Sequence, residues 1–276
     1  MKSSIKKIGL YCFLTLLVLI YAFPILWVVL MSFKHTADAF TIPPKWFFEP
    51  TLENYKYIFA EKNIIPFLKN SFIICFATSI ISILIGTPAS YAYARYKSDR
   101  SLITLLGMLS VRMFPYMLMI IPFFVFAIKF GLFDTYTILI LTYTPFNLVF
   151  AIWILRGFFK AVPVDVEEAA KVDGCSEFGA FLRVTLPNIL AGLAATFFII
   201  FLLSWNEFYM FGLILTSQSA KPLTIALAEY QAAELIEYWS WSSAIVTVSI
   251  LPAIVLLILL RKYLILGFTF GLGEEK

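Results

Sequence analysis

The residues of this sequence that could do chemistry are few and widely separated. Among 276 residues there are three cysteines and one histidine. No CxxC pair exists, and His35 has no second metal ligand beside it, so neither a metal site nor a disulfide framework is predicted. The sequence also has no GxxxxGK[ST] phosphate loop, so we expect this chain to bind no ATP in that mode and no other cofactor.

Two charged residues stand inside long apolar runs, Arg112 and Glu207. Charged groups in such positions are costly and seldom face lipid. One interpretation is an ion pair that fixes a helix bundle, and the other is a lining for a polar path. An Arg–Glu pair without a histidine cluster or paired carboxylates is a poor catalytic set, so no catalytic residue is predicted.

A second group of polar residues forms the longest charged connection, at about 156–188. Pro163 is placed as the first residue of a helix, and Gly174 follows as its stop. Acidic side chains occupy the first turns, where the helix dipole favours them: Asp165, Glu167 and Glu168. Lys171 lies four residues after Glu167, a spacing that allows an ion pair on one helix face. We therefore predict a helix of about ten residues.

A second short helix is predicted directly after it. Phe178, Phe181 and Leu182 have the i, i+3, i+4 spacing of one apolar face, and Leu186-Pro187 ends the helix. Ala169 and Ala170 permit close approach of another backbone, and exposed aromatics typically fill pockets of a partner. We interpret residues 162–186, named the docking segment below, as a protein-docking site; the alternative is an amphipathic helix on the membrane surface.

Composition indicates the elements that must position these residues. Hydrophobic residues make up 61% of the chain and charged residues 14%, against about 25% charged in soluble domains. A helical membrane protein is the class that fits, in one domain over 1–276. A crossing needs about 20 apolar residues, and uncharged runs predict six transmembrane helices, several with prolines that kink them: about 8–33, 70–94, 101–128, 135–155, 188–216 and 238–260.

The positive charges predict an orientation. With the N-terminus inside, the inner segments hold 13 Lys and Arg and the outer segments hold 7. The positive-inside rule therefore places both termini in the cytoplasm of a multi-pass membrane protein. The net charge of +4 comes without a dense basic patch, so no nucleic-acid partner is expected.

Several motifs resemble one family. Glu168-Ala169-Ala170, then Gly174, then Val184-x-Leu186-Pro187 resembles the EAA loop of binding-protein-dependent ABC importer permeases. The resemblance extends along the chain, as the end of the second predicted span (89–95), the sequence Trp205-Asn206-Glu207-Phe208 and the ending 261–269 are similar to those of carbohydrate importers. The chain is identified as resembling the MalG-like permease subunits of maltose and oligosaccharide importers.

The resemblance implies a type I ABC importer permease fold in the inner membrane of a prokaryote. Its partners would be a homologous second permease subunit, a dimer of ATPases that binds ATP and Mg²⁺, an external solute-binding protein and membrane lipid. The docking segment would be the pair of coupling helices that ATPase closure moves. It would use these residues: Glu168, Ala169, Ala170, Asp173, Gly174, Phe178, Phe181, Leu186 and Pro187.

The translocated solute is implied to be a sugar. Sugar sites combine hydroxyl-binding polar groups with aromatic surfaces, and the candidate path residues are Arg112, Tyr116, Trp205, Asn206, Glu207 and Tyr209. Glycerol phosphate or another polar solute is an alternative cargo. Two other classes remain as alternatives. A self-contained secondary transporter would usually show repeated halves, which are not evident, and a membrane-embedded enzyme lacks its catalytic set.

Overall fold

All regular structure is helical in the part of the chain that the computed structural model describes, which covers residues 2–39, 41–96, 99–113, 115–207, 209–231 and 237–271. The all-α prediction is therefore confirmed. The chain divides into two compact units. Unit 1 comprises residues 1–66 and 226–251, and unit 2 comprises residues 67–225 and 252–276.

Unit 1 begins with the long helix α1 (Lys2–Ser32), which contains Pro24. Short helices α2 (Thr36–Ala39) and α3 (Glu53–Lys56) follow, and α3 continues into a π-helical turn, η1 (Tyr57–Glu61). The first part of α14 (Glu237–Gly271) also belongs here. The ring of Tyr57 stacks on that of Trp241 at 3.8 Å, which joins η1 to α14.

Unit 2 is built around three long helices, α4 (Ile65–Arg95), α7 (Tyr136–Ala161) and α11 (Leu190–Glu207). Small residues let them approach closely. A Cβ added at Gly86 of α4 would come within 2.9 Å of the Cβ of Ala151 on α7, and one at Gly192 of α11 would come within 2.4 Å of the Phe158 ring. Side chains at these glycines would force the helices apart.

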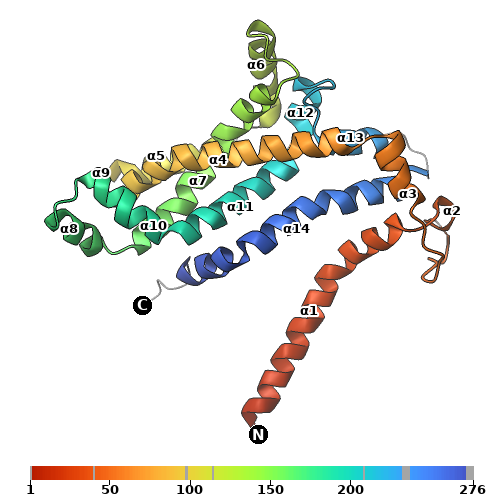
Figure 1. Cartoon of the computed structure of the whole chain (residues 1–276), viewed down its shortest axis with the longest axis horizontal. Helices are drawn as coiled ribbons and strands as arrows, with labels where there is room; N and C mark the ends of the chain where they lie inside the picture. The colour runs from red at the N-terminus through yellow and green to blue at the C-terminus, as the bar shows by residue number, and fades with distance from the viewer. Residues whose placement is uncertain are drawn as a thin grey trace. The chain divides into compact units, whose positions relative to one another are not determined.

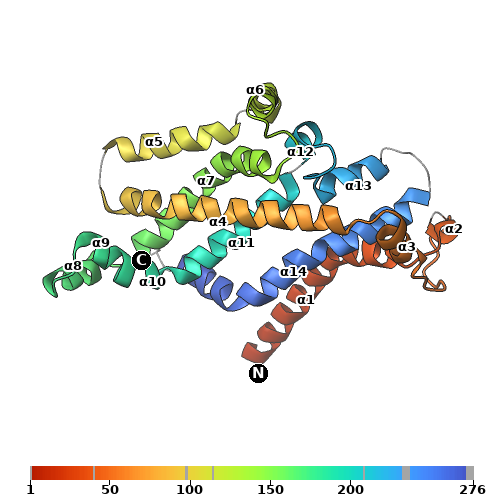
Figure 2. The same cartoon turned by 45° about the horizontal axis from the view of Figure 1, so that its top comes forward.

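The shorter helices of unit 2 form two groups around this bundle (Figure 1, Figure 2). Helices α8 (Val164–Val172), α9 (Glu177–Ala180) and α10 (Leu186–Asn188) lie at the end where α4 terminates, as Figure 1 shows. Helices α6 (Tyr116–Lys129) and α12 (Tyr209–Leu215) lie together near the start of α7 (Figure 2). Helix α13 (Leu223–Gln231) follows α12 in the chain.

Four of the predicted spans coincide with long apolar helices, and their assignment as membrane crossings stays a prediction. Among the described residues, four helices are long and apolar enough to cross a membrane, within α1, α4, α7 and α14. A fifth crossing results if the bent pair 177–188 and 190–206 is counted as one, with an angle of 71° at the break. Helix α7 continues six residues beyond the predicted end at 155, so that Arg156 and Lys160 are helical.

The single helix predicted over 101–128 is wrong. Helix α5 (Asp99–Ser110) ends in a 3₁₀ turn, η2 (Val111–Met113), and α6 begins after Pro115, which has an extended ψ of 118°. Proline has no N–H to complete the preceding turn and disfavours a helical conformation at the residue before it. The break therefore falls beside Arg112, the charged residue within this run.

A network of hydrogen bonds fastens the connection between α12 and α13. The Asp134 carboxylate accepts hydrogen bonds from the backbone N–H groups of residues 217–220 at 2.9–3.2 Å, and from the Ser217 hydroxyl at 2.9 Å. The amide of Asn70 donates to the carbonyl oxygens of Ser219 and Lys221, both at 3.0 Å. The turn before α7 and the first part of α4 thereby hold this loop.

Candidate functional site

The first helix of the docking segment is set by its two ends. Val162 and Pro163 alone connect α7 to α8, and Pro163 is the N-cap rather than the first helical residue predicted. Asp165 and Glu167 occupy the first turn and Lys171 the last, which suits the helix dipole at both ends. The predicted helix is confirmed with nine residues.

Gly174 stops α8 through a defined hydrogen-bond pattern. The N–H of Cys175 donates to the carbonyl of Ala170 and the N–H of Gly174 to that of Lys171, both at 3.0 Å. These two bonds form a Schellman motif, which needs a left-handed residue at its centre. Gly174 supplies it with φ +91°, and a Cβ there would meet no atom within 4 Å. Within this chain, glycine is therefore required at position 174 for its backbone conformation and not for lack of space.

The second part of the docking segment is a helix with an irregular middle. Ser176 caps α9, accepting a hydrogen bond from the N–H of Gly179 at 3.1 Å. The chain continues through a π-helical turn, η3 (Phe181–Thr185), into α10. It then bends at Ile189, which is buried in the core. The predicted end at Leu186-Pro187 is therefore two residues early.

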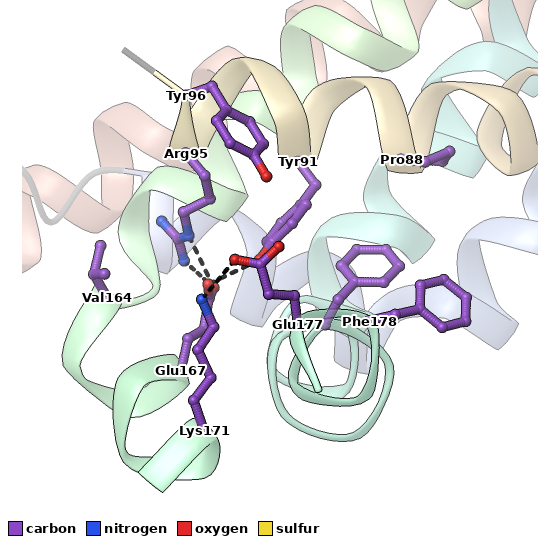
Figure 3. A pocket seen from close by; sticks show the side chains of 10 residues that line it. Pro88, Tyr91, Arg95, Tyr96, Val164, Glu167, Lys171, Glu177 and Phe178 are labelled. Atoms are coloured by element: carbon purple, nitrogen blue, oxygen red, sulfur yellow. Dashed lines mark hydrogen bonds and ion pairs between the residues drawn. The ribbon is translucent and has the colours of Figure 1, made fainter. Parts of the chain in front are cut away.

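A buried ion pair attaches α8 to the end of α4 (Figure 3). The Nε of Arg95 donates to Oε1 of Glu167 at 2.8 Å, and the Tyr91 hydroxyl donates to Oε2 at 3.0 Å. The side chains of Arg95 and Glu167 are 11% and 4% exposed. Because both carboxylate oxygens are bonded to residues one turn apart on α4, the orientation of α8 against α4 is determined.

The same arginine also reaches α7. Its Nη2 donates to the carbonyl oxygen of Val162, the C-cap residue of α7, at 3.0 Å. In the opposite direction, Nε of Arg156 on α7 donates to the carbonyl oxygen of Tyr93 on α4 at 3.2 Å. The ends of α4 and α7 and the start of α8 are therefore cross-linked by hydrogen bonds and an ion pair.

The charge state of Glu167 follows from its partners. Burial by itself would raise the pKa of this carboxyl, but the hydrogen bonds to it, that from Arg95 first, outweigh burial and lower the pKa. Glu167 is therefore ionised at neutral pH, and the ion pair with Arg95 is intact there.

Beside the ion pair lies a cavity of about 510 Å³ between the end of α4 and the docking segment. Figure 3 shows Tyr96, Lys171, Glu177 and Phe178 around it. Nζ of Lys171 pairs with Glu177 at 3.3 Å, and not with Glu167 as the spacing within α8 suggested. Glu167 points inward to Arg95, so its partner comes from another helix.

The structure places most of the predicted docking residues on the surface. Phe178 is 69% exposed, and these residues are exposed with it: Glu168, Ala169, Asp173, Gly174 and Pro187. Ala170 and Leu186 are half-buried. Phe181 was expected on the exposed face and is instead buried, 8% exposed, against the rings of Tyr91 and Phe159. The chain's own core thus uses Phe181, whereas Phe178 faces outward.

Arg112 connects the broken span to the bundle. Its guanidinium donates to the carbonyl oxygen of Phe146 and to Oδ1 of Asn147, both at 3.3 Å, and lies 4.0 Å above the ring of Phe150. The amide of Asn147 in turn donates to the hydroxyl of Ser204 on α11 at 3.1 Å. These contacts form a polar chain from η2 through α7 to α11.

The other predicted path residues differ in placement. Trp205 is 9% exposed and stacks on Phe201 at 5.4 Å, within the hydrophobic core rather than on an open surface. Asn206 is exposed and donates to the carbonyl oxygen of Leu202. The side chains of Tyr116, Glu207 and Tyr209 lie outside the described part of the structure, so the Arg112–Glu207 pair stays a prediction.

Sequence reasoning did not single out the buried cluster of Tyr91, Arg95 and Glu167. A partial signal exists, since Tyr91 and Arg95 are four residues apart and share a helix face at the end of a predicted span. Nothing local distinguishes Glu167 from Glu168. Among the described residues, no group of His, Cys, Asp and Glu could hold a metal ion.

Comparisons with known proteins show the family of this chain. Residues 82–268 match the family of binding-protein-dependent transport system inner membrane components, and the chain belongs to this family. It is thus a membrane-embedded permease subunit of an ABC transporter and is not itself an enzyme. The matched region includes α4 from Ser82 onward, the docking segment and most of α14.

Individual relatives are similar over nearly their whole length. The probable ABC transporter permease y4oR of Sinorhizobium fredii is 32% identical over 96% of this chain and 95% of its own. The trehalose transport permease SugB of Mycobacterium tuberculosis is 31% identical over 90% of both chains. The diacetylchitobiose uptake permease NgcG of Streptomyces coelicolor is 35% identical, covering 84% of this chain and 77% of its own.

A solved structure shares the fold. A chain of a bacterial ABC transporter for import of alginate superimposes with a TM-score of 0.71 at 20% identity, over 96% of this chain and 98% of that one. The fold is therefore that of an ABC importer permease.

Proposed function

We propose that this chain is one of two permease subunits that carry a sugar or oligosaccharide into the cytoplasm. An external solute-binding protein delivers the sugar, and ATP hydrolysis on a partner ATPase dimer drives transport. The carbohydrates named for SugB and NgcG support this substrate class. The engagement of Arg112 by Phe146, Asn147 and Phe150 also favours a neutral sugar over glycerol phosphate, because a phosphate would have to compete with these contacts.

The observation that carries the mechanism is the buried attachment of α8 to α4. We infer that the ATPase contacts the exposed residues of the docking segment, above all Glu168 and Phe178. Arg95 then transmits the displacement to α4 through its own helix and to α7 through the carbonyl oxygen of Val162. The docking segment acts as a lever on two spans, with both chain termini in the cytoplasm.

The coupling role is tested by charge reversal at the exposed contact. Glu168→Lys is expected to abolish uptake and copurification of the ATPase, with membrane insertion unchanged, because Glu168 is exposed on the surface of α8. Glu61→Lys makes the same charge change at another exposed position and should leave both activities normal. Normal uptake and normal copurification in Glu168→Lys would contradict the proposal.

The path is tested separately. If Glu207 accepts sugar hydroxyls, Glu207→Gln should reduce uptake at unchanged protein level. Uptake equal to that of the parent protein would remove Glu207 from the path. Substrate-stimulated ATP hydrolysis by the reconstituted complex over a sugar panel, with glycerol phosphate included, tests the cargo class.

A further inference from the structure

In unit 1, the chain that follows α1 is folded against the end of that helix. The N–H of Thr51 donates to the carbonyl oxygen of Phe33 at 2.8 Å. The buried amide of Asn54 donates to the carbonyl oxygens of Ser32 and Lys34 at 2.9 and 2.8 Å. These bonds satisfy carbonyl groups at the end of α1 and directly after it, and they hold the residues around Thr51 and Asn54 beside the end of that helix.

A buried lysine holds the middle of this segment. Lys34 is 2% exposed, and its Nζ donates to the carbonyl oxygen of Lys45 at 2.7 Å. The same ammonium group lies 5.1 Å from the ring centres of Trp27 and Phe48, within the range of cation–π attraction. Residues 41–48, the 41–48 loop below, are thereby drawn back toward α1.

The 41–48 loop returns along the membrane-spanning helix. The ring of Trp46 lies 5.0 Å from that of Trp27 and 6.5 Å from that of Phe23. Trp27 and Phe23 precede Ser32, the last residue of α1, by five and nine positions. At 1.5 Å per residue, the ring of Trp46 therefore lies about 7–14 Å back from the end of the helix.

This loop presents bare apolar side chains. Ile42 is 97% exposed, Phe47 94% and Trp46 57%. The one cation among them, Lys45, is paired with both carboxylate oxygens of Asp38 at 2.8 and 2.9 Å. Contiguous exposed apolar groups mark a surface that another apolar phase covers. Because Lys45 is already paired with Asp38, its charge offers little attraction to a charged protein partner.

The depth of the loop matches the membrane interface. The apolar part of α1, Lys6–Ser32, has 27 residues, or about 40 Å, which spans the hydrocarbon core and reaches both polar interfaces. Trp and Tyr are enriched at this level. Pro43 and Pro44 have no backbone N–H, which lowers the number of donors that the interface would leave without a partner.

We propose that the 41–48 loop is a membrane anchor in which Ile42, Trp46 and Phe47 insert into the boundary between lipid headgroups and acyl chains beside α1. The occupant of this surface is phospholipid. The anchor fixes the depth of α1 and is independent of the cargo and of the ATPase contact.

The test measures the surroundings of residues 42 and 47 in the purified transporter in phospholipid nanodiscs. Spin labels are attached to Ile42→Cys and Phe47→Cys, with Gln218→Cys as the control at another exposed loop. The three native cysteines are first replaced by serine or alanine, with uptake checked. Collision rates of each label are compared for oxygen, which enters lipid, and a nickel chelate, which stays in water.

Frequent oxygen and rare nickel collisions at 42 and 47, with a ratio several-fold above that at 218, are the expected result. Frequent nickel collisions would place the loop in water and overturn the proposal. Rare collisions with both reagents would mean that protein covers the loop, such as the second permease, which also overturns it. The unaltered protein gives a second measurement, as a photoactivatable phospholipid should cross-link to residues 42–47. Cross-links to α1 alone would count against the anchor.

Discussion

Removal of the buried charge at Glu167 tests how the docking segment is attached. Glu167→Gln keeps the shape of the side chain and replaces charge-assisted hydrogen bonds with neutral ones. Bonds to charged groups contribute about 1.5–3 kcal/mol, and complete removal of one partner from a buried pair costs about 3–5 kcal/mol. We expect Glu167→Gln to weaken the attachment of α8 by an amount in the lower of these two ranges. The fraction of molecules in which α8 is detached from α4 would then rise roughly 10- to 100-fold.

The assay separates coupling from stability. Sugar uptake and ATP hydrolysis are measured on the same amount of assembled complex, and their ratio is the readout. The ratio should fall in Glu167→Gln, because ATPase movement reaches α4 and α7 less often. Glu177→Gln is the matched control, since it breaks the exposed pair with Lys171, and exposed pairs contribute about 0–1 kcal/mol. Glu167→Arg and Arg95→Glu each place like charges together and should lower the ratio. The double variant, which restores opposite charges, should recover part of what each single variant loses.

Two results would refute this reasoning. A normal ratio in Glu167→Gln at normal assembly would show that the ion pair does not transmit movement. A smaller yield of assembled complex, with an unchanged ratio of uptake to hydrolysis in the complex that does assemble, would assign Glu167 a structural role alone.

The pKa of Glu167 predicts the pH dependence of the attachment. Because its pKa is lowered on folding, the ion pair contributes its full stability above the ordinary pKa of glutamate, and loses it as the pH falls through the lowered value. The uptake-to-hydrolysis ratio should therefore be level around neutral pH and fall only in acid. Glu167→Gln should lack that acid-dependent fall.

Three further predictions concern other parts of unit 2. Gly174→Ala should destabilise the docking segment by about 1–2 kcal/mol because φ is positive there, and Gly174→Asn by less, as thermal unfolding would show; equal effects would contradict the conformational explanation. Asp134→Asn should speed hydrogen exchange of the amides of 217–220, whose shared acceptor loses its charge; unchanged protection would refute this. Asn147→Ala should cost about 1–3 kcal/mol by leaving part of the Arg112 guanidinium without its acceptor, and unaltered unfolding would show that this contact is dispensable.

Much of the helical organisation was predictable because its causes are local. Uncharged runs marked α1, α4, α7 and α14, and the proline, acidic turn and glycine around α8 marked its limits to within one residue at the start. The break at Arg112 was missed, although Pro115 was visible, because proline kinks some membrane helices and interrupts others.

The docking segment shows where local information stops. Its exposed face was predicted from Phe178 and Phe181, whose spacing places them on one side of a helix. Phe181 is nevertheless buried, because its helix packs on Tyr91 and Phe159. The packing partner, and not the periodicity, decides which aromatic of such a pair faces inward.

The sequence by itself determined the class of protein, since scarce charge and long apolar runs allow few folds, and a spaced motif indicated the family. Only the tertiary structure decided which glutamate anchors α8 and which remains for a partner. Glu167 and Glu168 are chemically equal neighbours, but successive residues of a helix point about 100° apart. Glu167 is the anchor because the folded chain places it beside Arg95, which lies 72 residues earlier in the sequence and bonds to Glu167.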